Sequence, residues 1–473
     1  MLAHFRIRHV VLALALLGGC QARETPSAQP PPPRREMQAP TGVTITVAPN
    51  HPLMDQRLSI SINGLPPSRP VSVTARAKAA DGLWWRSQAV FMSDGGGRVD
   101  PAAQAPVSGA YRGVDGMGLF WSMGPDIEPK KSEHAYFDMG DPSKPNETLL
   151  EVTQSGRVVA STDVWRRFVD PGVHASAASD GLEGVLYSPN DGAAHPAVLI
   201  IGGSDGGPGA PNVAMLLASH GFTTLSIAYF GEKNLPATLQ RVPMEYFAHA
   251  LDWLRRQPSV DPRFVAIYGE SRGTEPALWI AANDQRVSAV VARSPSFALW
   301  GGVTANHLPG GAAWTHNGKD LPFIANRISV GFAAQYLADM MTRTPVRQTA
   351  LFLEDLRGFG DTSAVEIPVE KIRGPVLLLA GRGDQIWPSE LMARRIMARL
   401  GGRHPYTDAM VAYDDVGHPV PYVYAPLEGD RRHVKFAVGG TVEGAAKAQA
   451  DAWPRILAFL ETAAHRALTV QFH

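Results

Sequence analysis

Two patterns of apolar and polar residues divide this chain, and the first is a set of short runs that alternate with period two. Turn residues such as Asn63-Gly64 and Asp81-Gly82 separate these runs. Alternation at this spacing predicts short antiparallel strands that together form a β-sandwich over residues 42–168. The expected strands are 43–47, 58–62, 71–76 and 87–91.

After residue 168 the pattern changes to buried strands that alternate with helical stretches. Strands alternating with helices predict parallel β-α-β units, hence a doubly wound, mostly parallel sheet over 169–473. The strands are expected at 197–201, 223–228, 265–268, 289–292, 376–380 and 409–413. The helices are expected at 212–220, 244–256, 276–282, 389–400 and about 443–465.

The segment of about 70 residues at 301–370 is too long for a plain crossover between two strands of that sheet. It carries two helical stretches, near 332–342 and 348–356. We therefore expect a cap over the site that the sheet builds.

One turn within the second pattern has the spacing of a nucleophile elbow. Gly269-Glu270-Ser271-Arg272-Gly273 lies between a strand and a helix. In G-x-S-x-G the glycines permit a strained turn that exposes the serine hydroxyl beside a helix N-terminus. Ser271 is then the expected nucleophile, and the N–H of Arg272 an expected oxyanion donor. The alternative for the pentapeptide alone is an ordinary turn.

Two further residues follow strands of the same sheet, where its catalytic groups are expected. Asp384 comes after the strand at 376–380, and His418 comes after the strand at 409–413. The order Ser, Asp, His along the chain is that of α/β-hydrolases. Asp414 and Asp415 are the alternatives for the acid, but Asp384 is better placed, because it follows a strand of its own at 376–380.

A glycine-rich loop at 202–207 follows the first strand of the sheet and is expected to supply the second oxyanion donor. Small residues leave backbone N–H groups accessible, so Gly203 or Ser204 is the expected donor. The loop lacks the Lys-Ser/Thr ending of a phosphate-binding loop, which argues against nucleotide binding. The chemistry requires no metal and no organic cofactor.

Composition narrows the possible partners. The chain has 44 basic and 44 acidic residues, and this balance does not indicate a nucleic-acid partner. The single cysteine, Cys20, excludes an internal disulfide and a cysteine-rich metal site. The sequence does not indicate an oligomeric state.

Cys20 ends a segment with the features of an export signal. Arg6 and Arg8 precede an apolar run at 10–17, and Leu17-Gly18-Gly19 leads into the cysteine. Eight apolar residues are too few to cross a bilayer, which takes about 20. The ending resembles the lipobox of bacterial lipoproteins, with Cys20 lipidated after removal of a signal peptide. A plain N-terminal anchor helix or a mis-assigned start is the alternative.

Residues 21–41 are rich in proline and lack an apolar period, which predicts an extended tether. Together with a lipidated Cys20, the tether would hold the folded protein near a membrane. Gln21 after the cysteine favours, by the same resemblance, the periplasmic face of the outer membrane in a bacterial cell envelope.

The chain resembles the acyl-CoA thioesterases related to bile acid-CoA:amino acid N-acyltransferase. The matching strings lie at 63–67, 85–91, 99–100, 105–106, 113–123, 228–230, 234–236, 245–247, 269–275, 387–390 and 417–418. The resemblance implies an immunoglobulin-like sandwich before an α/β-hydrolase, a triad of Ser271, Asp384 and His418, and hydrolysis of fatty acyl-CoA. Its members carry Ser or Cys as nucleophile, the cysteine going with amide-forming transfer, so Ser271 indicates the hydrolase variant.

The export signal departs from this family, whose members usually work inside cells. Coenzyme A thioesters are not expected in a periplasm, so three interpretations stay open. The first is an acyl-thioester hydrolase acting on a small-molecule substrate. The second is an envelope carboxylesterase, peptidase or acyltransferase using the same triad. The third is a non-catalytic lipoprotein that binds through its sandwich.

Overall fold

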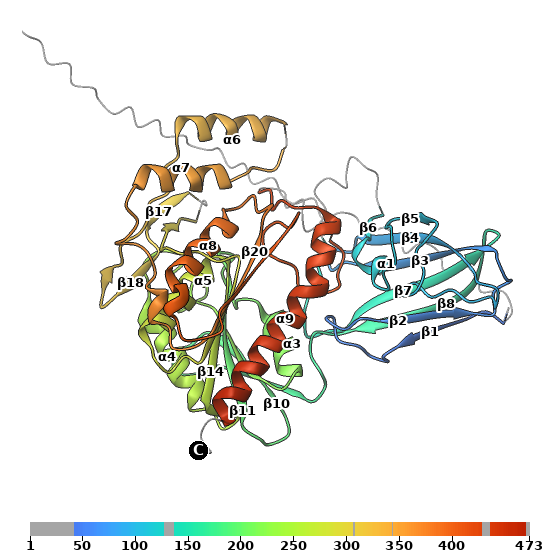
Figure 1. Ribbon diagram of the computed structural model, residues 1–473, viewed down its shortest axis with the longest axis horizontal. Coiled ribbons are helices and arrows are strands. Elements are labelled where there is room, and N and C mark those ends of the chain that lie inside the picture. Colours follow the sequence, from blue (N-terminus) through green and yellow to red (C-terminus); the bar gives the residue numbers. More distant parts are fainter. Residues whose placement is uncertain (1–41, 127–136, 306–307, 343, 428–435, 470–473) are drawn as a thin grey trace, which may run out of the picture.

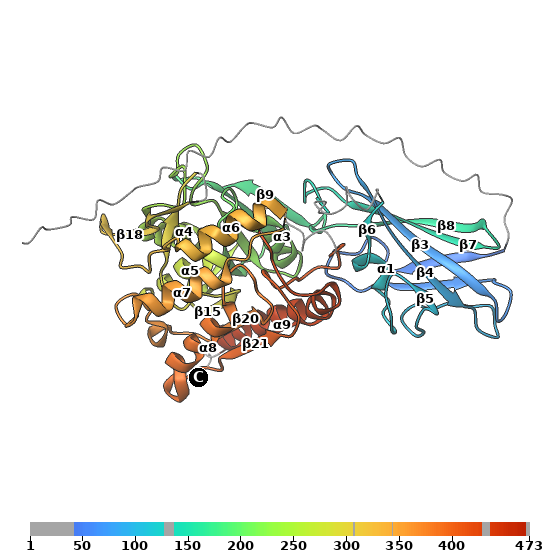
Figure 2. The same ribbon diagram turned by 90° about the horizontal axis from the view of Figure 1, so that it is seen from above.

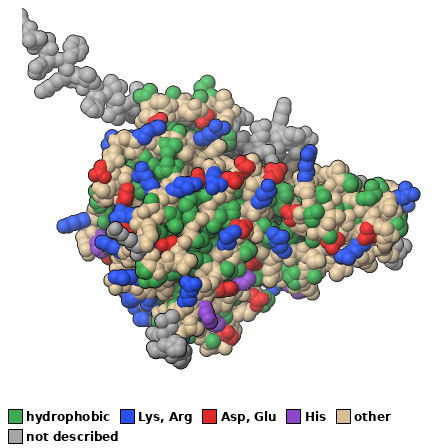
Figure 3. Space-filling view, in the orientation of Figure 1, with side chains coloured by type: hydrophobic (Ala, Val, Ile, Leu, Met, Phe, Trp, Pro, Cys, Tyr) green, Lys and Arg blue, Asp and Glu red, His purple; other side chains and the backbone are tan. Residues whose placement is uncertain are grey.

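The computed structural model describes residues 42–126, 137–305, 308–342, 344–427 and 436–469. The predicted signal peptide at 1–20, its Cys20 and the tether at 21–41 lie outside the described residues, so their assignments stay predictions. No helix within the described residues is long and apolar enough to span a membrane. Basic and acidic side chains are interspersed over the face seen in Figure 3.

The first part of the chain forms two antiparallel sheets, which lie to the right in Figures 1 and 2. One sheet pairs β1 with β2, and the other has the order β5-β4-β3-β7-β8 with β6 on β4. Apolar residues on alternate positions of both sheets share one core, in which Trp85 and Phe91 are fully buried. The predicted all-β sandwich is confirmed. Its strands are β1 Thr44–Ala48, β2 Ser59–Asn63, β3 Pro70–Lys78, β4 Trp84–Met92, β5 Ser108–Gly109, β6 Gly124–Pro125, β7 Asn146–Gln154 and β8 Arg157–Arg166.

The hairpin of β7 and β8 was missing from the predicted strands. Its loop is Ser155-Gly156, and both residues have positive φ, 48° and 78°. Positive φ at both central residues is the type I′ geometry that matches the twist of the flanking strands. The Ser-Gly pair is therefore a turn signal in the sequence. A short helix, α1 Gly118–Trp121, lies beside this sheet.

The second part is an eight-stranded sheet of order β21-β20-β15-β14-β11-β12-β10-β9. The six strands from β21 to β12 run parallel, β10 is antiparallel to β12, and β9 is antiparallel to β10. The predicted doubly wound, mostly parallel sheet is confirmed. Its strands are β9 Val173–Ala177, β10 Gly184–Pro189, β11 His195–Ile201, β12 Thr223–Ile227, β14 Val260–Glu270, β15 Ala289–Arg293, β20 Val376–Gly381 and β21 Ala409–Tyr413.

Helices cover both faces of this sheet because successive residues of a strand point to opposite sides. Leu199 of β11 packs with one set of helices, and Val198 packs with the other. Helices α4 Met244–Arg255, α5 Thr274–Asn283 and α8 Ser389–Leu400 cover the first face. Helices α3 Pro211–Ser219 and α9 Val442–Thr469 cover the second. Residues of α9 also join the core of the sandwich, so the two parts pack together (Figure 1).

The segment predicted as a cap contains two helices, α6 Val330–Thr342 and α7 Thr349–Phe359, at the top of Figure 1. It also contains short strands, which a prediction based on helical stretches did not include. These are β16 Gly301–Val303, β17 Pro309–Ala312, β18 Trp314–His316 and β19 Lys319–Asp320. A further short strand, β13 Val242–Pro243, pairs with β18 and connects this segment to the start of α4.

Candidate active site

The elbow at Ser271 is a tight turn between the end of β14 and the start of α5. Ser271 has φ of 51°, a left-handed conformation that is strained for a residue with a side chain. Gly269 and Gly273 must be glycines because other atoms approach their Cα atoms too closely to leave room for a Cβ. A Cβ on Gly273 would lie 2.2 Å from the carbonyl oxygen of Gly202, and one on Gly269 would lie 2.8 Å from Cβ of Ala277. The turn therefore presses Ser271 against the glycine loop after β11.

The structure brings Ser271, Asp384 and His418 together, although 147 residues separate the first from the last. Nε2 of His418 lies 2.8 Å from Oγ of Ser271, and Nδ1 of His418 lies 2.9 Å from Oδ2 of Asp384. All three side chains are buried. In this arrangement the serine hydroxyl can donate to the imidazole while the imidazole donates to the carboxylate.

Asp384 is held in place by its own loop. Its Oδ1 accepts hydrogen bonds from the backbone N–H of Ile386 at 2.9 Å and of Trp387 at 3.2 Å. Trp387 is buried, and its ring meets the His418 imidazole edge-on with centroids 5.8 Å apart. The loop after β20 thus orients both the carboxylate and the face of the imidazole.

The two competing aspartates lie elsewhere. Asp414 is exposed and forms an ion pair with Arg382. Asp415 has φ of 53°, and its backbone carbonyl accepts a hydrogen bond from Thr441 at 2.6 Å. Asp384 is the carboxylate that contacts His418.

The glycine loop at 202–207 lies beside the serine. An ideal Cβ on Gly203 would be 3.3 Å from Cβ and 3.8 Å from Oγ of Ser271. The Tyr229 hydroxyl contacts the carbonyl oxygens of Gly202 at 2.9 Å and Gly203 at 2.5 Å. In a trans peptide the N–H points away from the C=O, so the N–H groups of Gly203 and Ser204 face away from Tyr229. Both predicted loop donors therefore remain candidates by position.

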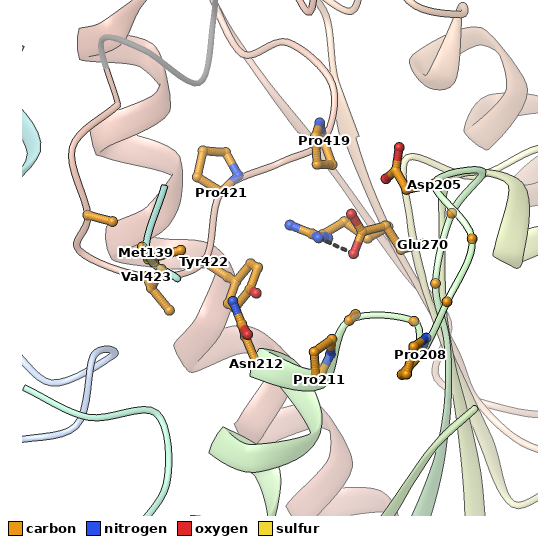
Figure 4. Close-up of a pocket in the computed structure, with 18 of the residues that line it drawn as sticks. Met139, Asp205, Pro208, Pro211, Asn212, Glu270, Pro419, Pro421, Tyr422 and Val423 are labelled. Carbon is orange, nitrogen blue, oxygen red and sulfur yellow. Dashed lines mark ion pairs between the residues drawn. The ribbon is translucent and has the colours of Figure 1, made fainter. Parts of the chain in front are cut away.

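A cavity of about 320 Å³ opens next to the elbow, between the glycine loop and the residues after His418 (Figure 4). Its wall holds an ion pair between Glu270 and Arg293, drawn as a dashed line in Figure 4. Arg293 also donates to the carbonyl of Val420 and lies 4.7 Å from the ring centroid of Tyr422. Burial opposes ionisation of Arg293, but the Glu270 carboxylate together with Tyr268 and Tyr422 outweighs burial and raises the pKa of the guanidinium. Arg293 thus links the residue before the serine to the loop of the histidine.

The predicted site did not include Glu270 and Arg293 as a pair. They are register partners at the ends of the adjacent parallel strands β14 and β15. The available signal was a pair of opposite charges, each directly after an apolar or glycine run, at 264–269 in β14 and at 289–292 in β15. The prediction for Arg272 concerned its backbone N–H alone and missed its side chain. Among the described residues, no group of three or more His, Cys, Asp or Glu side chains could hold a metal ion.

Comparison with known proteins gives matches over both parts of the chain. The family profile "Acyl-CoA thioester hydrolase/BAAT N-terminal region" matches residues 55–179, and "BAAT / Acyl-CoA thioester hydrolase C terminal" matches residues 242–466. The mouse acyl-coenzyme A amino acid N-acyltransferase 1 is 29% identical over 81% of this chain and 88% of its own length. The rat mitochondrial acyl-coenzyme A thioesterase 2 is 28% identical over 91% and 92%. The mouse peroxisomal succinyl-coenzyme A thioesterase is 28% identical over 86% and 93%.

Proposed function

Because the chain belongs to the family of acyl-CoA thioester hydrolases and bile acid-CoA:amino acid N-acyltransferases, we propose that it hydrolyses acyl thioesters through Ser271. The observation that carries the proposal is the position of His418, within 2.8 Å of the Ser271 hydroxyl and 2.9 Å of the Asp384 carboxylate. The names of the relatives supply the class of substrate, since they include thioesterases acting on acyl-CoA.

In the first half of the proposed reaction, Oγ of Ser271 attacks the acyl carbonyl carbon while its proton passes to Nε2 of His418. Asp384 stabilises the imidazolium and accepts a hydrogen bond from Nδ1–H of His418, which keeps that proton on Nδ1. The C–S bond breaks as the tetrahedral intermediate collapses, and the acyl group stays on Ser271. A thiol has a pKa of about 8.5, so the sulfur can leave as a thiolate. The His418 imidazolium then gives the proton taken from Ser271 to that sulfur, so the thiol departs and the imidazole is neutral again.

In the second half, water replaces the thiol. His418 takes a proton from the water as its oxygen attacks the acyl-serine carbonyl carbon, then returns a proton to Oγ of Ser271. The products are a carboxylic acid and the free enzyme. The negative oxygen of each tetrahedral intermediate would be held by the N–H of Arg272 and that of Gly203 or Ser204. The closeness of Gly203 to Ser271 supports this assignment.

One observation favours a second candidate, hydrolysis of carboxylic esters. Among the described residues that line the cavity, Arg293 is the only basic one, and Glu270 already pairs with it. The phosphates of coenzyme A would need cationic partners. An ester presents the same acyl carbonyl without those phosphates, and the elbow recognises the carbonyl.

The test is a comparison of kcat/KM for acyl-CoA thioesters and for p-nitrophenyl esters of the same acyl chains, from butyryl to palmitoyl. We expect both classes to be hydrolysed by the wild type and neither by Ser271→Ala. Preference for the thioester at every chain length would reject the ester alternative. Turnover that survives in Ser271→Ala would reject the proposed mechanism.

We also propose that the protein is anchored to a membrane through a lipidated Cys20, on the strength of its Leu-Gly-Gly-Cys ending. A tether of about 20 residues at ~3.1 Å per residue would let the folded part move up to roughly 60 Å from the anchor. Fractionation of cells expressing the wild type and Cys20→Ala tests this. The wild type should sediment with membranes and the variant should not; wild type in the cytosol would refute the anchor.

A further inference from the structure

A buried ion pair lies directly behind the elbow. Nη1 of Arg272 is 3.1 Å from Oε1 of Glu275, one turn further along the chain. The side chain of Glu275 is fully buried, and Arg272 is only 5% exposed. Burial raises the pKa of Glu275 to about 7, and Arg272 opposes that rise. Burying two ionisable groups carries a large desolvation penalty unless both are fully paired. A role for this pair beyond stability is therefore worth seeking.

Both members of the pair also bind the start of the cap segment. Nη2 of Arg272 donates to the carbonyls of Trp300 at 3.2 Å and Gly301 at 2.9 Å. Oε2 of Glu275 accepts from the backbone N–H of Trp300 at 3.1 Å and from Nε1 of Trp314 at 2.7 Å. Four hydrogen bonds to charged groups therefore connect the elbow to Trp300, to Gly301 at the start of β16 and to Trp314 in β18, and such bonds are stronger than neutral ones.

The same part of the cap reaches the histidine from the other side. The Trp300 ring meets Phe352 of α7 with centroids 4.8 Å apart, and Phe352 meets Trp387 at 5.9 Å. Trp387 in turn lies edge-on to His418 at 5.8 Å. Trp300 thus connects to the serine turn through hydrogen bonds and to the imidazole through a row of aromatic contacts.

We propose that Arg272 and Glu275 are positioning residues that aim the Arg272 N–H at the oxyanion and tie that donor to the cap. This inference rests on the proposed function. The N–H of Arg272 belongs to the peptide that follows Ser271, whose left-handed φ of 51° persists only if neighbouring contacts hold it. The buried Arg272 side chain, fixed at Nη1 by Glu275 and at Nη2 by the cap, supplies such contacts.

The experiment compares the wild type with Glu275→Gln, Trp314→Phe and the double variant Arg272→Met/Glu275→Gln. For each, kcat and KM are measured with p-nitrophenyl butyrate, and Ki with a trifluoromethyl ketone that forms a tetrahedral adduct with serine. Thermal unfolding gives Tm. We expect Glu275→Gln to lower kcat about 10–100-fold, with KM within about 3-fold and Ki raised by the same factor as kcat. Trp314→Phe removes one hydrogen bond to Glu275. It should lower kcat less than Glu275→Gln does, and Ki should again rise by the factor by which kcat falls.

The double variant separates positioning from structure. Replacing both charges by uncharged side chains should return Tm to near the wild-type value, because no unpaired charge remains, while kcat stays low. Arg399→Met is the control, because it breaks partly exposed ion pairs with Glu366 at 3.0 Å and Glu370 at 2.6 Å, at the C-terminal end of α8. It should leave kcat and Ki unchanged.

The inference is overturned if Ki does not move in the folded variants, or if kcat returns together with Tm in the double variant. Should Glu275→Gln not fold, Trp314→Phe and the double variant give the same decision. Failure of the proposed function would look different: turnover would then survive in Ser271→Ala, whatever the variants at 272 and 275 do.

Discussion

Replacing Asp384 by asparagine should abolish most turnover by changing which imidazole nitrogen carries the proton. Oδ1 of Asp384 accepts two backbone N–H groups, from Ile386 at 2.9 Å and Trp387 at 3.2 Å. An asparagine must place its carbonyl oxygen there, since its NH₂ would face two donors. The NH₂ then points at Nδ1 of His418, where the carboxylate oxygen lay at 2.9 Å.

Facing a donor, Nδ1 must become the acceptor, so the proton moves to Nε2. His418 then has no lone pair for the Ser271 hydroxyl at 2.8 Å, and general-base catalysis is lost. The same type of change in a serine protease triad lowers kcat about 10⁴-fold, which corresponds to about 5 kcal/mol of activation free energy. We expect a loss of that order here, with KM changed little.

The assay is steady-state hydrolysis of p-nitrophenyl butyrate by the wild type, Asp384→Asn, Asp414→Asn and Asp415→Asn. The two controls change exposed or backbone-anchored aspartates, and asparagine tolerates the positive φ of 53° at Asp415. Both controls should keep kcat within about 3-fold of the wild type, because neither side chain contacts the His418 imidazole or changes which of its nitrogens carries the proton. Equal losses in Asp384→Asn and Asp415→Asn would refute the assignment of the acid, as would a loss below about 10-fold in Asp384→Asn.

Three other predictions follow from the same site. Ser271→Ala should lower kcat at least about 10⁴-fold with an unchanged circular dichroism spectrum, and a milder loss would argue against a serine nucleophile. Gly273→Ala would place a Cβ 2.2 Å from the Gly202 carbonyl and should lower kcat about 100-fold, whereas Gly358→Ala, with open space around it, should keep full activity. The pKa of Glu275 is raised to about 7, so the unfolded carboxyl loses its proton first as pH rises. The free energy of unfolding of the wild type, relative to Glu275→Gln, should thus fall by roughly 3 kcal/mol between pH 4.5 and 7; urea titrations showing no such fall would contradict the raised pKa.

Much of the fold could be predicted because it depends on local pattern. The β14 strand, the elbow and α5 are adjacent in sequence, and Gly269 and Gly273 mark the two places where a Cβ would collide with backbone or helix. Strands buried on both faces read as apolar runs, and helices between them imply parallel pairing. The ends of parallel strands meet at one edge of the sheet, so the sequence alone places Asp384 and His418 near Ser271.

Other features depend on contacts between segments far apart in the chain. The choice of Asp384 over Asp415 is decided by the two N–H groups of its loop and by the path of the residues before His418. A charged side chain carries no periodic signal that identifies its partner, so the sequence did not reveal the pairing of Glu270 with Arg293 across two strands. The hydrogen bonds from Arg272 and Glu275 to Trp300 and Trp314 likewise exist only once residues 300–314 pack against the elbow. Local patterns of hydrophobicity and turn chemistry determine which elements form, whereas burial in the folded protein decides which polar groups must find one another, because an unpaired buried charge is too costly to persist.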